Sequence, residues 1–321
     1  MPLRISVPRR SPLASLTWSK NVTIRTSALL RSYSTSPPEA TLKITSIAAP
    51  HAGSIKILSL NRPQARNAIS AQLLGELGRE IHSIAQEDAK TGSTRAVIIA
   101  SESDDAFCAG ADLKERLTFT PEETKHFLTT LRNTFSALST LPIPTISAIS
   151  STAFGGGLEL ALCTTFRVFA STATVGLPET RLAIIPGAGG TYRLPALIGT
   201  SRARDLILTG RPVSAPEGYF TGLCDRLVEL PVSDPSGLSA EQLKDHKVAA
   251  RKQTLEAAVA LANDVCAGGP VATRAALEAV NMWGAGDEAE NKAYEKVFVT
   301  EDRMEALRAF ADKRRPAFKG R

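Results

Sequence analysis

Gly155-Gly156-Gly157-Leu158-Glu159-Leu160-Ala161-Leu162 is the most informative stretch of this sequence, because three glycines lead directly into an apolar run that holds one carboxylate. Glycines that open a helix leave backbone N–H groups free to point at whatever lies in front of them. An ionised carboxylate is costly in apolar surroundings unless it is paired or hydrogen-bonded. A Glu in a first helical turn is also common because it interacts favourably with the helix dipole. The stretch therefore indicates either an ordinary helix start or a site with aimed donors beside a titratable group.

The segments around this stretch have the pattern of an α/β protein. We expect strands at 55–60, 95–100, 145–149 and 166–170 and helices at 70–89 and 120–141. Ser70 is a plausible N-cap for the first helix, and Thr120 followed by Pro121 is a plausible start for the second. Apolar strands that alternate with helices are typical of a buried parallel sheet.

The second half of the chain is expected to be helical. Residues 231–248 are polar and rich in turn-forming residues, so they predict a loop or linker. From about residue 249 the pattern is helical, in three or four pieces divided at 268–270 and 284–286. The predicted architecture is thus a βαβ-type core followed by a C-terminal helical subdomain, and helical tails of this kind often pack on a neighbouring subunit.

The N-terminal 38 residues have the composition of a targeting segment. They contain six of the chain's 38 basic residues and none of its 32 acidic residues, so the remainder is electrically balanced. Segments rich in Arg and Ser and free of acids are typical of organellar transit peptides. Arg31-Ser32-Tyr33-Ser34 resembles a mitochondrial processing site with cleavage after Tyr33. A balanced mature chain lacks the basic footprint of a nucleic-acid-binding protein.

The remaining composition argues against metal and membrane chemistry. The four cysteines have no CxxC spacing, and the four histidines form no HxxxH or HExxH pattern. We therefore expect neither a metal site nor a disulfide framework. No window holds the roughly 18 apolar residues that a membrane-spanning helix requires, so we expect no membrane association.

A second turn of interest is Phe107-Cys108-Ala109-Gly110-Ala111-Asp112-Leu113-Lys114, which follows the predicted strand at 95–100. Ligand sites in α/β proteins gather beyond the carboxyl ends of strands. Gly110 would let the backbone approach a ligand closely, and the N–H of Ala111 could then point into the site. An ordinary strand-to-helix turn with Asp112 as its cap accounts for the same residues.

A third element, Leu177-Pro178-Glu179, adds a second carboxylate after an extended segment. The glycine run at 185–190 follows it six residues later. That run lacks both the G-x-G-x-x-G spacing and the preceding strand of a dinucleotide loop, so we reject that interpretation.

Taken together, these motifs resemble the signature of the crotonase, or enoyl-CoA hydratase/isomerase, superfamily. The matching stretches are Asn61-Arg62-Pro63, Asn67-Ala68, Ala109-Gly110-Ala111-Asp112, Gly155-Gly156-Gly157-Leu158-Glu159, Leu177-Pro178-Glu179 and Ile185-Pro186-Gly187-Ala188-Gly189-Gly190. The resemblance covers about residues 52–321 and implies an α/β fold, a crotonase-like ββα spiral core with a C-terminal helical subdomain. We accordingly expect a transit peptide at 1–33, a flexible linker at 34–50, the spiral core at 51–248 and a helical oligomerisation subdomain at 249–321.

The resemblance also implies roles for particular residues. The family's oxyanion hole consists of two backbone N–H groups that fall on Ala111 and Gly156, where they would stabilise negative charge on a thioester oxygen. The two glutamates of the hydratase members fall on Glu159, assigned mainly to water activation, and Glu179, assigned mainly to proton delivery. Gly187 matches the glycine whose backbone helps to hold the catalytic water. The other expected substrate-binding residues are Ala109, Gly110, Asp112, Leu113, Lys114, Gly155 and Pro178.

Residues 177–187 and 303–316 resemble the methylglutaconyl-CoA hydratase subfamily, which acts in mitochondrial leucine breakdown. This resemblance implies a matrix location, an acyl-CoA substrate, no separate cofactor and a homotrimer or homohexamer. A short-chain enoyl-CoA hydratase of fatty-acid oxidation is the alternative. Lys114, Arg116 and Arg181 are candidates for binding the distal carboxylate of the substrate, but a solvated side chain is the simpler interpretation of each. The CoA phosphates also require cations, and the sequence does not separate these two roles.

Some members of this subfamily also bind AU-rich RNA through a lysine-rich helix. The equivalent stretch at 70–91 contains only two basic residues, Arg79 and Lys90, against four acidic ones. A net-negative helix cannot neutralise phosphates, so RNA binding by this chain is not expected.

Overall fold

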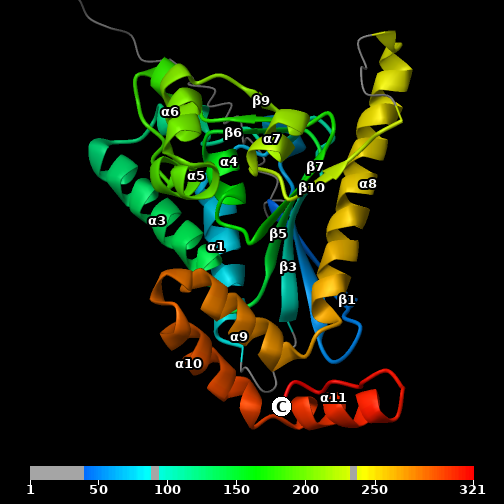
Figure 1. The fold of residues 1–321 in the computed structure, drawn as a ribbon. Coiled ribbons are helices and arrows are strands. Elements are labelled where there is room, and N and C mark those ends of the chain that lie inside the picture. The colour runs from blue at the N-terminus through cyan, green and yellow to red at the C-terminus, as the bar shows by residue number, and fades with distance from the viewer. Residues whose placement is uncertain (1–39, 88–93, 232–236) are drawn as a thin grey trace, which may run out of the picture. The chain divides into compact units, whose positions relative to one another are not determined.

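The computed structural model of the protein describes residues 40–87, 94–231 and 237–321 (Figure 1). Its strands are β1 (Leu42–Ala48), β2 (Ser54–Leu60), β3 (Thr94–Ser101), β4 (Ala106–Cys108), β5 (Thr145–Ile149), β6 (Thr152–Phe154), β7 (Phe166–Ala170), β8 (Thr174–Gly176), β9 (Val213–Ser214) and β10 (Arg226–Val228). Its α-helices are α1 (Ala71–Ala85), α2 (Leu113–Arg116), α3 (Pro121–Ser139), α4 (Gly156–Ala161), α5 (Gly190–Ile198), α6 (Thr200–Thr209), α7 (Ala215–Thr221), α8 (Ala240–Cys266), α9 (Pro270–Asn281), α10 (Asp287–Phe298) and α11 (Glu301–Ala311). Short 3-10 helices include η1 (Pro63–Ala65), η2 (Glu179–Leu182) and η4 (Trp283–Ala285).

Two sheets make up the core. The larger sheet has the order β1-β2-β3-β5-β7-β10, in which only β1 runs antiparallel to its neighbour. The smaller sheet has the order β4-β6-β8-β9, with β4, β6 and β8 parallel. The chain passes from a strand of the large sheet to one of the small sheet three times, at β3–β4, β5–β6 and β7–β8. This repeated turn is the ββα spiral, and it confirms the predicted fold class.

The two faces of the large sheet are covered by different helices, because alternate side chains of a strand point to opposite faces. Ile55 and Ile57 of β2 belong to a hydrophobic cluster with side chains of α8. Leu58 and Leu60 belong to the cluster that contains the buried side chains of α1 and α3. Figure 1 shows α8 running along one side of the sheet and α1 and α3 on the other.

The helix starts that the sequence predicted are present. Ser70 caps α1 by accepting a hydrogen bond from Leu73 N, as expected from its position. Thr120 and Glu123 form a reciprocal capping box at the start of α3. Both caps satisfy N–H groups that a helix leaves unpaired, which is why short-range sequence rules could locate them. Within the described residues, no helix combines the length and the apolar character that crossing a membrane would demand.

The expected domain boundaries need three corrections. The predicted linker at 34–50 was wrong in its second half, where β1 pairs with β2 along all seven of its residues. Most of β1 is exposed, so it lacked the apolar run that identified the other strands. The predicted loop at 231–248 was wrong from Ala240 onward, where α8 begins. The boundary at 248/249 therefore falls inside α8, a helix that packs on the sheet of the core. The predicted transit peptide at 1–33 lies outside the described residues.

Candidate active site

Three segments of the site follow three neighbouring parallel strands of the small sheet. β4 leads into the turn Ala109–Asp112, β6 leads into α4, and β8 leads through Leu177 and Pro178 into η2. The carboxyl ends of parallel strands meet at one edge of a sheet, which is where α/β proteins place their ligands. The topology thus brings together the three motifs that the sequence singled out.

The turn Ala109–Asp112 is pinned to the segment before α1. Ile69 N donates to Gly110 O at 2.8 Å, and Asp112 N donates to Ile69 O at 3.1 Å. Asp112 also caps α2 and forms an ion pair with Arg62 at 3.0 Å. Asn67, fully buried, donates from its side-chain amide to the carbonyl of Phe107. Arg62 of the Asn-Arg-Pro motif and Asn67 of the Asn-Ala motif therefore stabilise this turn.

The turn Ala109–Asp112 and the start of α4 are in backbone contact. Gly110 has φ +96°, and a Cβ added to it would lie 2.8 Å from Phe154 O and 3.4 Å from Gly156 N. A Cβ added to Gly156 would lie 3.6 Å from Ala111 N, so the two amides are neighbours. Across residues 40–87, 94–231 and 237–321, neither of these two N–H groups has a hydrogen-bond acceptor. Two adjacent free donors, one of them at a helix N-terminus, can bind a single negatively charged oxygen atom.

Glu159 is held one turn into α4 and is only 3% exposed. Its Oε1 accepts hydrogen bonds from Ala188 N at 2.7 Å and Gly190 N at 2.9 Å. Burial raises the pKa of Glu159, and the two N–H donors and the charges of Arg193 and Arg132 oppose that rise. The carboxylate is therefore fixed through one oxygen, which leaves the other available for chemistry.

Glu179 is the second buried carboxyl group, at the start of η2 and 8% exposed. Its Oε1 approaches Gly155, where an added Cβ would lie 3.1 Å away. Its Oε2 is buried without a hydrogen-bond partner in the described part of the chain. Burial raises the pKa of Glu179 to about 7, and the nearby charge of Glu159 acts in the same direction. Glu179 can therefore carry a proton near neutral pH.

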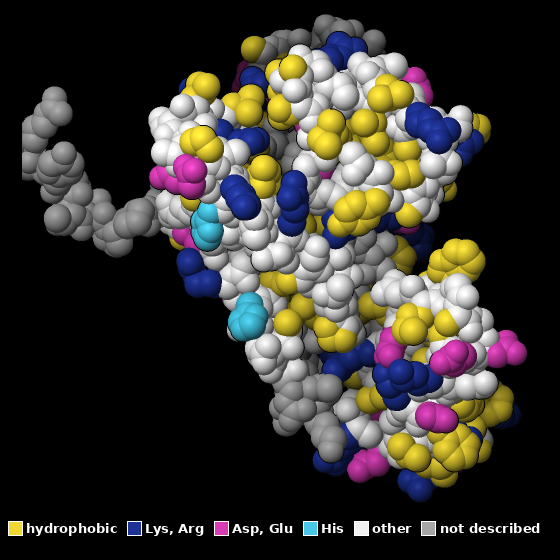
Figure 2. Space-filling model, turned by 90° about the vertical axis from the view of Figure 1, so that its left-hand side faces the viewer, with side chains coloured by type: hydrophobic (Ala, Val, Ile, Leu, Met, Phe, Trp, Pro, Cys, Tyr) yellow, Lys and Arg dark blue, Asp and Glu magenta, His cyan; other side chains and the backbone are white. Residues whose placement is uncertain are grey.

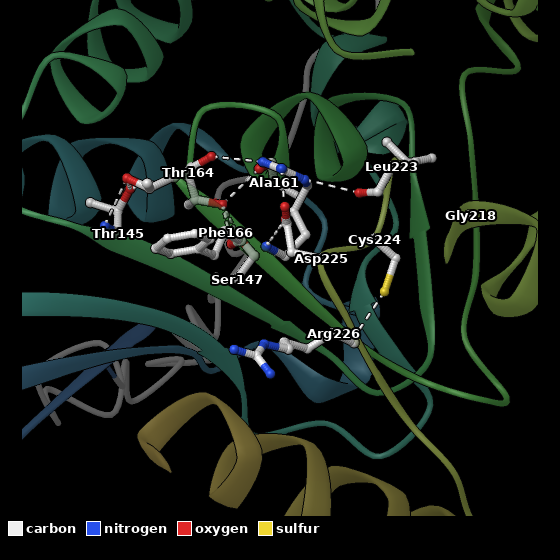
Figure 3. Close-up of polar contacts among 12 residues, drawn as sticks. Thr145, Ser147, Ala161, Thr164, Phe166, Gly218, Leu223, Cys224, Asp225 and Arg226 are labelled. Carbon is white, nitrogen blue, oxygen red and sulfur yellow. Dashed lines mark hydrogen bonds and ion pairs between the residues drawn. The ribbon is translucent and has the colours of Figure 1, made fainter. Parts of the chain in front are cut away.

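The C-terminal end of α4 is anchored by a buried arginine network (Figure 3). Arg167 of β7 pairs with Asp225 at 2.7 Å and donates to the carbonyls of Leu223 and Thr164. Thr164 in turn donates from Oγ1 to Ala161 O, the last residue of α4, at 2.7 Å. The helix that carries Gly156 and Glu159 is thus fixed at its far end as well as at the glycine turn.

The structure does not bring every predicted site residue into this arrangement. Leu113 and Lys114 are exposed on α2, and Arg116 is partly exposed on the same helix. Arg181 donates from Nε to Thr209 O at 2.8 Å, so part of its guanidinium is committed to the end of α6. The carbonyl of Gly187 accepts from Arg132 Nε at 2.7 Å.

Sequence reasoning missed the residues that hold Glu159 in place. Ala188 and Gly190 were recognised as parts of a motif but not as donors to Glu159. Arg132 on α3 and Arg193 on α5 were not recognised at all. The only sequence signal for the two donors was the glycine run itself, because its backbone N–H groups are accessible to a carboxylate.

Comparison with known proteins gives a consistent result. The chain matches the family described as enoyl-CoA hydratase/isomerase over residues 51–321. It is 61% identical to an enoyl-CoA isomerase/hydratase of Zymoseptoria tritici, with 97% of each chain covered. It is 54% identical to the mitochondrial methylglutaconyl-CoA hydratase 1 of Pyricularia oryzae, with 91% of this chain and 90% of that protein covered. The crystal structure of an enoyl-CoA hydratase from Bacillus anthracis superimposes with a TM-score of 0.76 at 39% identity, over 88% of this chain and all of that chain.

Proposed function

This chain belongs to the enoyl-CoA hydratase/isomerase family and is an acyl-CoA hydratase, and we propose that its substrate is 3-methylglutaconyl-CoA. The product of adding water would be 3-hydroxy-3-methylglutaryl-CoA. The observation that carries this proposal is the 54% identity, over nine-tenths of both chains, to a protein named methylglutaconyl-CoA hydratase. The paired carboxyl groups of Glu159 and Glu179 beside two free amides supply chemistry that suits the reaction.

The first role that we propose is an oxyanion hole formed by the N–H groups of Ala111 and Gly156. Attack of water at C3 of the enoyl thioester moves an electron pair from the double bond toward the thioester oxygen. Two preorganised donors would stabilise the charge that develops there, and losing one such donor typically costs about 3 kcal/mol in the transition state. The backbone contact between Gly110 and Gly156 supports this assignment, because it sets the two amides side by side.

The second role is the division of labour between the two carboxyl groups. Glu159, whose Oε1 accepts two N–H bonds, would remove a proton from the attacking water as general base. Glu179, with its pKa raised to about 7, would deliver a proton to C2 as general acid. The two groups titrate as a coupled pair, so a pH profile would report values that belong to the pair. The reaction needs only water and the thioester, which fits the proposal that no metal or separate cofactor takes part.

Assembly and location are further parts of the proposal. Large apolar side chains of the C-terminal helices are exposed, including Trp283 at 83% and Phe310 at 86%. Figure 2 shows many exposed hydrophobic side chains on one face of the molecule. Such surfaces mark association sites, which supports self-association, and the homotrimer or homohexamer that we propose follows the family resemblance. Relatives named as mitochondrial support a mitochondrial location, and we place the enzyme in the matrix.

A short-chain enoyl-CoA hydratase is the second candidate, favoured by the 61% identity to a relative named enoyl-CoA isomerase/hydratase. The two candidates differ in whether a distal carboxylate must be bound, for which Lys114 and Arg116 remain the proposed cations. The test is a comparison of kcat/KM for 3-methylglutaconyl-CoA and crotonyl-CoA, followed by the loss of enoyl-thioester absorbance. A clear preference for crotonyl-CoA would overturn the methylglutaconyl proposal and leave the hydratase assignment intact.

RNA binding is not part of the proposal. The acidic side chains of α1 are used inside the protein: Glu76 accepts from Thr41 and Leu42, and Glu80 pairs with Lys56. Arg79 is the only Lys or Arg that α1 contributes. A gel-shift titration with AU-rich RNA at physiological salt should therefore show no tight complex.

A further inference from the structure

The segment 187–190 holds Glu159 through peptide groups that are themselves held at their carbonyl ends. In the peptide that joins Gly187 to Ala188, the carbonyl accepts from Arg132 Nε at 2.7 Å, and the N–H donates to Glu159 Oε1, also at 2.7 Å. In the next peptide the carbonyl of Ala188 accepts from an Arg193 guanidinium nitrogen at 2.9 Å. Arg132 is therefore linked to the carboxylate through one peptide group, whereas Arg193 holds the carbonyl of Ala188, the residue whose own N–H binds Glu159.

Such a chain of hydrogen bonds has two physical consequences. A donor on the carbonyl fixes the plane of the peptide. In the peptide that joins Gly187 to Ala188, the Arg132 donor also strengthens the N–H that binds Glu159, because hydrogen bonds in series polarise one another. The segment needs such support, since three of its four residues are glycine and one of them, Gly189, has φ +114°. The arginines also place positive charge near a buried carboxylate, which favours its ionised form.

We propose that Arg132 and Arg193 are positioning residues that hold the 187–190 segment so that its N–H groups orient the Glu159 carboxylate to remove a proton from the attacking water. This inference rests on the proposed role of Glu159 as the base, and it goes beyond that role by assigning how the base is kept in place. Neither arginine is a catalytic residue in this account, because each acts through the backbone of residues 187–190.

The charged and titratable groups that face Glu159 come from four elements. Arg132 lies on α3 and Arg193 on α5, and both lower the pKa of Glu159. Glu179 on η2 is the acidic neighbour, and the negative charges of the two glutamates repel each other. Cys163 lies on the turn after α4, and burial raises the pKa of its thiol to about 12, so it stays neutral at working pH. Removing a positive charge should therefore raise the pKa of Glu159.

Arg132 is the cleaner of the two residues to test. Its side chain is exposed on α3, so its replacement leaves no cavity in the core. Arg193 also donates to Ser139 Oγ at 3.3 Å and lies over the Tyr192 ring, so its loss would disturb the contact between α3 and α5 as well. Arg132→Gln removes the charge and keeps a donor, whereas Arg132→Lys keeps the charge and loses the planar guanidinium.

The experiment measures kcat, KM and the pH profile of kcat/KM for the full chain, with the enoyl-CoA that the unaltered protein hydrates best. For Arg132→Gln we expect kcat to fall roughly tenfold with little change in KM. The acidic limb of the kcat/KM profile should move to higher pH by roughly 0.2–0.7 unit, which is the scale of one exposed charge interaction. Arg132→Lys should return the acidic limb to its original position. Arg79→Gln, which removes an exposed charge from α1, is the matched control and should leave kcat and the acidic limb unchanged.

The outcomes separate this inference from the proposed function. If the unaltered protein hydrates no enoyl-CoA, the proposed function fails. If that protein is active but Arg132→Gln leaves kcat and the acidic limb where they were, the positioning role is refuted. A fall in kcat that follows only the loss of folded protein, with the limb unmoved, would also refute it, because a purely structural side chain has that signature.

Discussion

Replacing Glu179 by Gln should make the protein less active and, above neutral pH, more stable. Glu179 is 8% exposed, and its Oε2 has no hydrogen-bond partner among the residues that the structure describes. Burial makes an ionised carboxylate in that position costly, and the backbone N–H of Glu179 itself opposes only part of that cost. Gln has nearly the shape of the protonated side chain and cannot ionise, so it removes this cost.

The size of the effect follows from the pKa of Glu179. Burial raises that pKa from 4.5 to about 7, a displacement that corresponds to about 3 kcal/mol. Between these two values Glu179 binds more protons in the folded state than in the unfolded state, so its contribution to the free energy of unfolding falls as pH rises. The cost is absent below about pH 4.5 and fully present above about pH 7. The variant and the unaltered protein should therefore be equally stable in acid and differ most in mild alkali.

The assay is thermal unfolding of both proteins at one scan rate, across about pH 4 to 8.5. We expect the difference in Tm to grow from near zero at the acidic end to at least roughly 5 °C at the alkaline end. Glu256→Gln, which removes an exposed carboxylate from α8, is the control and should show no such growth. A difference that is the same at every pH, or a variant that is less stable in alkali, would refute the argument that Glu179 is buried at an energetic cost.

The remaining predictions concern other parts of the site. Glu159→Gln should lower kcat for hydration roughly 10²–10⁴-fold while binding of the CoA ester, measured by calorimetry, survives. Near-normal turnover would contradict its role as the base. Gly110→Ala should displace the turn, because its new Cβ would lie 2.8 Å from Phe154 O at a φ of +96°; kcat should fall roughly 10²–10³-fold, and an unchanged rate would argue against an oxyanion hole there. Arg167→Met should destabilise the fold by roughly 1–3 kcal/mol in chemical unfolding, since it removes the ion pair with Asp225 and leaves the carbonyls of Leu223 and Thr164 without their donor. A loss of under about 1 kcal/mol in the free energy of unfolding would show that Arg167 and Asp225 contribute no more than an ordinary surface ion pair.

Local rules were sufficient for much of the fold. Ser70 identified the start of α1, and Thr120 followed by Pro121 identified the start of α3, because a helix cap depends only on residues within the first turn. The buried strands β2, β3, β5 and β7 were identifiable because strands covered on both faces are continuously apolar. The same logic failed for β1, which is mostly exposed, and for the short strands of the small sheet, which have two or three residues each.

The sequence by itself determined which chemistry was present: two carboxyl groups, two glycine turns and a family signature in the right order. It could not determine how Glu159 is held, because its two backbone donors lie 29 and 31 residues away along the chain. The arginine that braces the first of those donors lies 55 residues from the carbonyl it binds. Contacts at such separations depend on the register of three parallel strands and on the packing of α3 against the glycine segment. Only the tertiary structure decided them, since no rule about neighbouring residues specifies which distant peptide groups meet a given side chain.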